Sequence, residues 1–215
     1  MKPSTQHKPN KPAAKKPGAA PARAARAAAG EVRIIGGQWK RSKLPVADKP
    51  GLRPTPDRVR ETLFNWLGQD LTGWRCVDAF AGTGALGFEA ASRGALQVQL
   101  VEQDTTLIAQ LKKIKEQLKA EAVQVQRGDG IAALKQLPPA SADLIFLDPP
   151  FDAALFDAAL QAAARAVAPG GYIYLEAPSV WGEEQLIPLR LALYRHLKAG
   201  AVHAHLLQRG VQVAP

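Results

Sequence analysis

The hydrophobic pattern of this chain of 215 residues changes near residue 75. From there on, short apolar runs bounded by turn residues alternate with longer segments in which apolar residues recur at helical spacing. The apolar runs predict strands at 75–80, 97–101, 122–126, 143–147 and 172–176. The segments between them predict helices at 85–93, 105–119, 131–137 and 153–167, the last closed by Pro169-Gly170-Gly171. Strands that alternate with such helices are typical of a doubly wound α/β sheet with mostly parallel strands.

Two smaller patterns flank this alternating region. On the C-terminal side, apolar stretches at 191–197 and 202–208 predict a closing hairpin. On the N-terminal side, residues 32–44 predict a hairpin that turns at Gly36-Gly37 and has a strongly basic second arm. A linker then leads to a short helix, with Thr55 as its N-cap and Pro56 at its first position. Apolar residues at helical spacing predict the buried face of that helix: Val59, Leu63, Trp66 and Leu67.

The first 30 residues differ in composition from the rest of the chain. They consist mainly of Lys, Pro, Ala, Arg and Gly, and prolines at 3, 9, 12, 17 and 21 prevent a continuous helix. We expect a disordered basic arm at 1–30, because almost nothing in it could drive collapse. The predicted organisation is therefore this arm, a basic hairpin and helix at 31–70, and an α/β domain at 71–215.

The net charge of +9 is concentrated near the N-terminus. Residues 1–30 carry seven Lys and Arg and no acid, 31–60 carry eight bases against three acids, and the remainder carries 13 bases against 16 acids. A near-neutral body with a basic front end is expected of a protein that meets phosphates. The single Cys76 excludes a disulfide framework, and no apolar stretch approaches the roughly 18 residues of a membrane span. Without a secretory signal either, we expect a cytoplasmic protein.

A glycine-rich turn follows the first predicted strand of the α/β region. The segment Val77-Asp78-Ala-Phe80-Ala-Gly82-Thr-Gly84-Ala-Leu-Gly87 runs from strand to helix, and its glycines let the backbone approach a ligand closely. Glu102 ends the next strand, 18 residues after Gly84, where a carboxylate can accept hydrogen bonds from ribose hydroxyls. The glycines also satisfy the GxGxxG dinucleotide fingerprint, so a nicotinamide-dependent dehydrogenase is an alternative at this point.

Two further carboxylates favour S-adenosylmethionine over a dinucleotide. Asp78 precedes the glycines, where it would repel a pyrophosphate and could instead accept a hydrogen bond from an ammonium group. Asp129 follows the third predicted strand and is suited to accept from an adenine amino group. Each of these acids, taken alone, could instead cap a helix or a turn.

The segment Asp148-Pro149-Pro150-Phe151 directly follows the apolar strand at 143–147. Open α/β sheets carry their chemistry at the carboxyl ends of the strands beside the cofactor crevice. An exocyclic amine is a poor nucleophile, because its lone pair is delocalised into the base. The Asp148 side chain and a carbonyl of the stiff Pro-Pro turn could each accept one of its N–H bonds and direct the lone pair at a methyl carbon. Phe151 offers a face on which an extruded base stacks, and the sulfonium electrophile needs no metal.

These segments together resemble a class I methyltransferase, and more narrowly the RsmD family of bacterial 16S rRNA guanine-N2 methyltransferases. The resemblance covers about residues 32–210 and is most specific at 33–44 and 51–66. It implies a Rossmann-like, mostly parallel sheet of seven strands, S-adenosylmethionine as the methyl donor, and a guanine of small-subunit rRNA as the acceptor. The family's cofactor residues correspond to Asp78, Phe80, Gly82, Gly84, Glu102 and Asp129. Its catalytic turn corresponds to Asp148, Pro149, Pro150 and Phe151.

Other functions are compatible with parts of this pattern. Related turns serve adenine-N6 methyltransferases acting on DNA and methyltransferases acting on a glutamine amide, whereas Asp at 148 and the basic hairpin favour guanine in RNA. A non-enzymatic alternative is a ribosome-associated binding module on an inactive Rossmann-like domain, against which the four intact acids argue. We expect 53–55 to lie over the cofactor or the target base. The candidate RNA contacts are the basic residues Arg33, Lys40, Arg41, Lys43 and Arg53.

Overall fold

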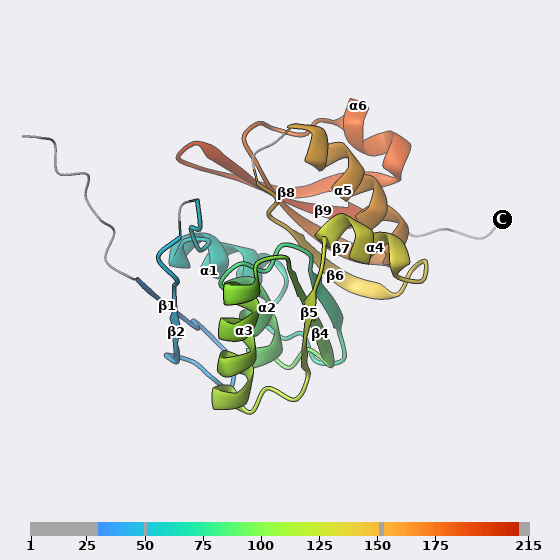
Figure 1. Ribbon diagram of the computed structural model, residues 1–215. Helices are drawn as coiled ribbons and strands as arrows, with labels where there is room; N and C mark the ends of the chain where they lie inside the picture. The colour runs from blue at the N-terminus through green and yellow to red at the C-terminus, as the bar shows by residue number, and fades with distance from the viewer. Residues whose placement is uncertain (1–29, 50, 151–152, 211–215) are drawn as a thin grey trace, which may run out of the picture.

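The computed structural model describes residues 30–49, 51–150 and 153–210 (Figure 1). Seven strands form one sheet in the order β5-β4-β3-β6-β7-β9-β8. The first five strands in that order run parallel, and β9 is antiparallel to both of its neighbours. This architecture confirms the predicted doubly wound α/β fold. The expected disordered arm at 1–30 lies outside the described residues, apart from Gly30.

The elements follow the predicted alternation along the chain. The strands of the main sheet are β3 (Arg75–Asp78), β4 (Gln97–Glu102), β5 (Val123–Arg127), β6 (Ala142–Leu147), β7 (Val167–Ala177), β8 (Leu191–Ala199) and β9 (Val202–Arg209). The helices are α1 (Asp57–Trp66), α2 (Ala85–Ser92), α3 (Thr105–Leu118), α4 (Gly130–Gln136), α5 (Ala153–Ala166), α6 (Glu183–Leu186) and the 3-10 helix η1 (Ile187–Leu189). The pattern did not predict α6 and η1. No helix in the described part of the chain is long and apolar enough to span a membrane.

Helices cover both faces of the sheet, which is why most residues of the central strands β3 and β6 are buried. Buried residues of α1, α2 and α3 form one cluster with strand residues such as Cys76 and Leu100. Buried residues of α4, α5 and α6 form a second cluster with Val77 and Ile145. Cys76 and Val77 are consecutive in β3 and point to opposite faces, as the period of two in a strand requires. Figure 1 shows α1, α2 and α3 grouped on one side and α4, α5 and α6 on the other.

The strand β7 begins earlier than predicted. The helix α5 ends at Ala166, and Val167 already pairs with Ala142 of β6. The next pairing joins Leu144 to Tyr172, so 168–171 form a bulge within the strand, with Gly170 at a φ of 79°. The Pro-Gly-Gly segment therefore lies inside a strand and does not merely end a helix. A bulge of this kind cannot be read from the hydrophobic pattern, because its residues have no regular partners.

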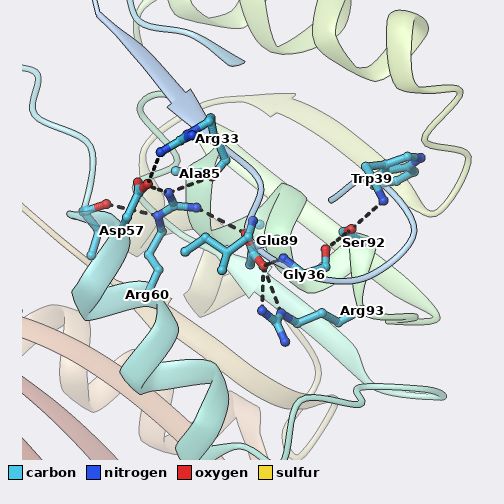
Figure 2. Close-up of polar contacts among 12 residues, drawn as sticks. Arg33, Gly36, Trp39, Asp57, Arg60, Ala85, Glu89, Ser92 and Arg93 are labelled. Carbon is cyan, nitrogen blue, oxygen red and sulfur yellow. Dashed lines mark hydrogen bonds and ion pairs between the residues drawn. The ribbon is translucent and has the colours of Figure 1, made fainter. Parts of the chain in front are cut away.

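The N-terminal hairpin exists, but the prediction that it turns at Gly36-Gly37 was wrong. The strands β1 (Glu31–Arg33) and β2 (Lys43–Pro45) pair antiparallel, and a loop at 34–42 connects them. The loop closes through backbone hydrogen bonds between Ile34 and both Arg41 and Ser42, and it is also held by side chains of α2 (Figure 2). Glu89 accepts from the N–H groups of Ile35 and Gly36, each over 2.8 Å, and Ser92 Oγ accepts from the Trp39 N–H over 2.9 Å.

The predicted N-cap of α1 was also wrong. The helix begins at Asp57 with Pro56 in the N-cap position, and no side chain caps it. The Thr55 hydroxyl instead donates to Glu176 Oε1 over 2.8 Å, and this contact is buried. Of the four residues predicted for the buried face, Val59, Leu63 and Leu67 are buried and Trp66 is only partly buried. Thr55 thus belongs to the interior beside β7.

Candidate active site

The carboxyl ends of the parallel strands open into a cavity of about 850 Å³. Because β3 and β6 are parallel neighbours that pair at Asp78 and Phe146, the turns that leave them lie at the same edge of the sheet. The glycine turn after β3 and the Asp-Pro-Pro turn after β6 both line this cavity. The predicted site residues that line it are Asp78, Phe80, Gly82, Glu102, Asp129, Asp148, Pro149 and Pro150. Phe151 lies outside the described residues.

Gly84 does not line the cavity but shapes the turn that does. It is the N-cap of α2 and has a left-handed φ of 77°, which glycine adopts at little cost. A Cβ at this position would lie 2.6 Å from Leu111 Cδ2 and 2.7 Å from Phe88 Cδ2, so the packing of α2 and α3 also requires glycine. Gly82, at a φ of 52°, does line the cavity.

The Glu102 carboxylate is oriented by three backbone groups. Its Oε2 accepts from the Gly82 N–H over 2.9 Å. Its Oε1 accepts from the N–H groups of Gln103 over 2.8 Å and Asp104 over 2.9 Å. Since Glu102 also lines the cavity, a rigidly held acceptor faces any ligand that enters beside the glycine turn.

Asp129 has a structural role and a position at the cavity at the same time. Its Oδ1 caps α4 by accepting from the Ala132 N–H over 2.7 Å. Its Oδ2 accepts from Gln103 Nε2 over 3.2 Å. A ligand that approached this acid from the cavity would therefore meet an acceptor whose rotamer is already fixed by the helix start.

Asp78 is buried at the end of β3, where its Oδ2 accepts from the Gly87 N–H over 3.1 Å. Burial, with a smaller contribution from the nearby charge of Glu102, raises the pKa of this carboxyl to about 7, while the hydrogen bond from the Gly87 N–H opposes the rise. A cationic ligand group beside Asp78 would favour its ionised form and return the pKa towards its ordinary value.

Asp148 stands at the start of the turn after β6. Burial, followed by the charges of Glu176 and Asp78, raises its pKa well above the ordinary value for an aspartate. A carboxyl whose pKa is raised takes up a proton more readily than an ordinary aspartate, and in its ionised form it accepts hydrogen bonds. The turn also brings Pro149 and Pro150 to the cavity wall.

The pattern of the sequence missed Glu176, whereas 53–55, which were expected to lie over the cofactor or the target base, do line the cavity. Glu176 lies near the carboxyl end of β7, next to β6, and lines the cavity together with 51–55, with Ala201 of the β8–β9 turn and with Val202 at the start of β9. An acid at the end of the strand predicted at 172–176 was a signal that could have pointed to it. Among the described residues, no three His, Cys, Asp or Glu side chains are grouped so that they could hold a metal ion.

Comparisons with known proteins place the chain in a family. Residues 32–208 match the protein family described as conserved hypothetical protein 95. The ribosomal RNA small subunit methyltransferase D of Escherichia coli K12 is 42% identical over 185 residues, which cover 85% of this chain and 92% of that protein. The chain belongs to the RsmD family of methyltransferases. The protein of the same name from Haemophilus influenzae is 46% identical over 156 residues, 69% of this chain and 80% of that protein.

Solved structures agree with this membership of the RsmD family. The Escherichia coli protein YhhF shares 40% sequence identity and a TM-score of 0.72, covering 85% of this chain and all of its own chain. The Haemophilus influenzae protein HI0767 shares 38% identity and a TM-score of 0.71, covering 84% of this chain and 99% of its own. The predicted resemblance to the RsmD family is thereby confirmed, and the cavity described above is the candidate active site of an RsmD-family methyltransferase.

Proposed function

We propose that this RsmD-family protein transfers a methyl group from S-adenosylmethionine to the exocyclic N2 of one guanine in 16S rRNA. The observation that carries the proposal is the shared cavity of two turns from neighbouring parallel strands, the glycine turn after β3 and the Asp148-Pro149-Pro150 turn after β6. The names of the Escherichia coli and Haemophilus influenzae relatives, which specify ribosomal RNA, support the substrate class.

The acidic residues at the carboxyl ends of β3, β4 and β5 fit the donor groups of S-adenosylmethionine. An ammonium group, two ribose hydroxyls and an adenine amino group all donate hydrogen bonds. Asp78, Glu102 and Asp129 supply acceptors that line the cavity and belong to, or closely follow, the consecutive strands β3, β4 and β5. Backbone N–H groups already fix two of these acids, Glu102 and Asp129. When bound, the cofactor supplies an electrophilic sulfonium methyl group.

The turn after β6 prepares the acceptor nitrogen. A side-chain oxygen of Asp148 and a carbonyl of the Pro149-Pro150 turn each accept one N–H of the amine, which directs the nitrogen lone pair at the methyl carbon. The new N–C bond forms as the C–S bond breaks, and the nitrogen then loses one proton. Asp148 is suited to receive that proton, since burial and neighbouring acids raise its pKa.

Two groups of basic residues would bind RNA phosphates, one at the cavity and one in the N-terminal hairpin. Arg53 lines the cavity itself. Lys40 and Arg41 lie in the loop that packs on Ser92, at the end of α2 remote from the glycine turn. Because an eight-residue helix is roughly 12 Å long, this loop lies about one helix length away from the glycine turn. Arg33 and Lys43 flank this loop and have acidic neighbours in Asp57 and Glu31. We therefore assign Arg53 to the nucleotide at the site and the hairpin residues to flanking RNA.

A transfer assay with three acceptors tests the proposal. Tritiated S-adenosylmethionine is incubated with the full chain and with rRNA from a deletion strain, plasmid DNA or a protein release factor. The proposal expects label in rRNA alone and, by mass spectrometry, the loss of one N2-methylguanosine from the deletion strain. Label in DNA would favour the adenine-N6 alternative, and label in the release factor would favour a glutamine acceptor.

A further inference from the structure

Glu176 is a buried acid on β7, the strand next to the one that leads into the partly buried Asp148. Only 7% of its surface is exposed, yet it lines the cavity. The Thr55 hydroxyl and the Tyr174 hydroxyl both donate to Glu176 Oε1, each over 2.8 Å. Among the residues that the structure describes, these are the two donors to this carboxylate, and they leave Oε2 for a ligand in the cavity.

The two hydroxyls fix the acid in place and favour its ionised form. Burial raises the pKa of Glu176, and the hydrogen bonds from Tyr174 and Thr55 act against that rise. Keeping a carboxylate at a buried position costs free energy unless it is compensated. Thr55 reaches Glu176 at the expense of capping α1, which starts without a side-chain cap. The hydrogen bonds from Thr55 and Tyr174 thus fix the Glu176 carboxylate. Its other oxygen, Oε2, is an acceptor at the cavity wall, next to the acid that would hold the methylated amine.

A pair of adjacent acceptors matches one base edge better than the others. Guanine presents its N2 amino group beside an N1–H, which is a second donor. Adenine and cytosine present their amino groups beside a ring nitrogen that carries a lone pair. With Asp148 accepting from the amine, an acceptor next to it gains a hydrogen bond from guanine and faces repulsion from the other two bases.

We propose that Glu176 is a specificity-determining residue that accepts the guanine N1–H, and that Thr55 is the positioning residue that orients it. This inference rests on the proposed function and deepens it, because it explains how the cavity selects guanine over another base with an exocyclic amine. A site built around a donor of the substrate discriminates strongly against an analogue without that donor, since its buried acceptor is then left unpaired.

Replacing the target guanine by 2-aminopurine provides the test. This base keeps the 2-amino group but carries a lone pair at N1. The methylated position is first mapped by mass spectrometry, and splint-ligated 16S rRNA with either base there is then offered to the full chain, both naked and reconstituted into small subunits. The measured quantity is the ratio of kcat/KM for guanine to that for 2-aminopurine, which does not depend on the fraction of enzyme that is folded.

The wild type is expected to favour guanine by roughly 100-fold, the upper range for discrimination by a good hydrogen-bond pair. In Glu176→Gln the amide oxygen can still accept from Thr55 and Tyr174, while the amide NH₂ replaces the free acceptor and donates to a ring lone pair. The ratio should therefore fall at least about 10-fold. Thr55→Val should lower the ratio and Thr55→Ser should restore it, which a merely structural role of Thr55 would not do.

Different results overturn different claims. If the ratio in Glu176→Gln stays at its wild-type value, whether or not both kcat/KM values fall, Glu176 does not accept from the guanine N1–H. This inference then fails while the proposed function stands. If the wild type accepts both bases equally, the same conclusion holds. If the wild type methylates no rRNA in any form, the proposed function itself fails.

Discussion

Arg60 and Glu89 form an ion pair of 3.2 Å in which neither side chain is exposed to solvent. Glu89 also accepts from the N–H groups of Ile35 and Gly36 and from the guanidinium of Arg93 (Figure 2). Arg60 in turn donates to the carbonyl of Arg33. One carboxylate therefore joins α1, α2 and the N-terminal loop, three segments that are far apart in the sequence.

Removing the negative charge from this cluster should destabilise the protein strongly. Glu89→Gln leaves Arg60 and Arg93 buried without their common partner, and breaking a buried pair in this way costs about 3–5 kcal/mol. Urea unfolding followed by circular dichroism measures the change. The exposed pair of Lys43 and Glu31, at 2.7 Å, is the control: Glu31→Gln should change the free energy of unfolding by less than about 1 kcal/mol. Equal effects of the two variants would contradict the importance assigned to the buried cluster.

The chemical role of Asp148 can be separated from cofactor binding. Asp148→Ala should lower kcat by at least about 100-fold, since it removes a group that acts on the reacting amine. The dissociation constant of S-adenosylmethionine, measured by calorimetry, should stay within a few fold of the wild-type value. The control is Asp143→Ala at the other end of the same strand, where the acid pairs with Arg75. Retained activity of Asp148→Ala would remove the proposed role.

Glu102 should contribute to cofactor affinity. Glu102→Ala removes an acceptor for the ribose and also the partner of the Gly82 N–H. Loss of a hydrogen bond to a charged group costs about 1.5–3 kcal/mol, so the dissociation constant should rise roughly 10- to 100-fold. The exposed Glu116 of α3 offers the matched control, Glu116→Ala, with no expected change. An unchanged constant for Glu102→Ala would count against the ribose assignment.

Asp78 makes the stability of the ligand-free protein depend on pH. Its pKa is raised from the ordinary value of 3.8 to about 7, so the folded state holds this proton more tightly than the unfolded state. The stability linked to the proton is fully present below pH 4 and is lost as the pH rises through about 7. Urea unfolding between pH 4.5 and 8 should show that the wild type loses stability relative to Asp78→Asn over this range. A constant difference between the two would refute the assignment.

Cofactor binding should show the opposite trend over part of that range. A ligand ammonium group prefers the ionised Asp78, so the affinity for S-adenosylmethionine should increase between pH 5.5 and about 7.5, as the carboxyl titrates around pH 7. Calorimetry at several pH values checks this. The dependence should be much weaker in Asp78→Asn, and an identical pH dependence in both proteins would show that another group is responsible.

The basic hairpin should act through phosphates. Neutralising Lys40, Arg41 and Lys43 together should weaken RNA binding and flatten its dependence on salt, by about 0.7–0.9 in the log–log slope for each phosphate that the protein no longer neutralises. Filter binding at several salt concentrations measures the slope. Exposed lysines of α3 and of its C-cap position serve as the control set: Lys112, Lys113 and Lys119. An equal change in both triple variants would mean that only net charge matters.

Much of the fold and of the site follows from local patterns in the sequence. Strand and helix periods are repeated over many residues, and parallel order follows from their alternation, so the sheet was predictable. The acids at the strand ends were predictable for the same reason: neighbouring parallel strands bring their carboxyl ends to one edge, and Asp78 and Asp148 follow strands that are neighbours.

Local sequence was therefore sufficient to predict the α/β sheet, the glycine turn and the Asp-Pro-Pro turn, because each depends on residues that are close together along the chain. The connections between distant segments emerged only from the packing of the whole chain. Thr55 was expected to cap a helix and instead donates to Glu176, and the loop at 34–42 is held by Glu89 instead of by a two-residue turn. A buried carboxylate takes whichever donors the packed chain brings within reach, and no local pattern specifies that choice.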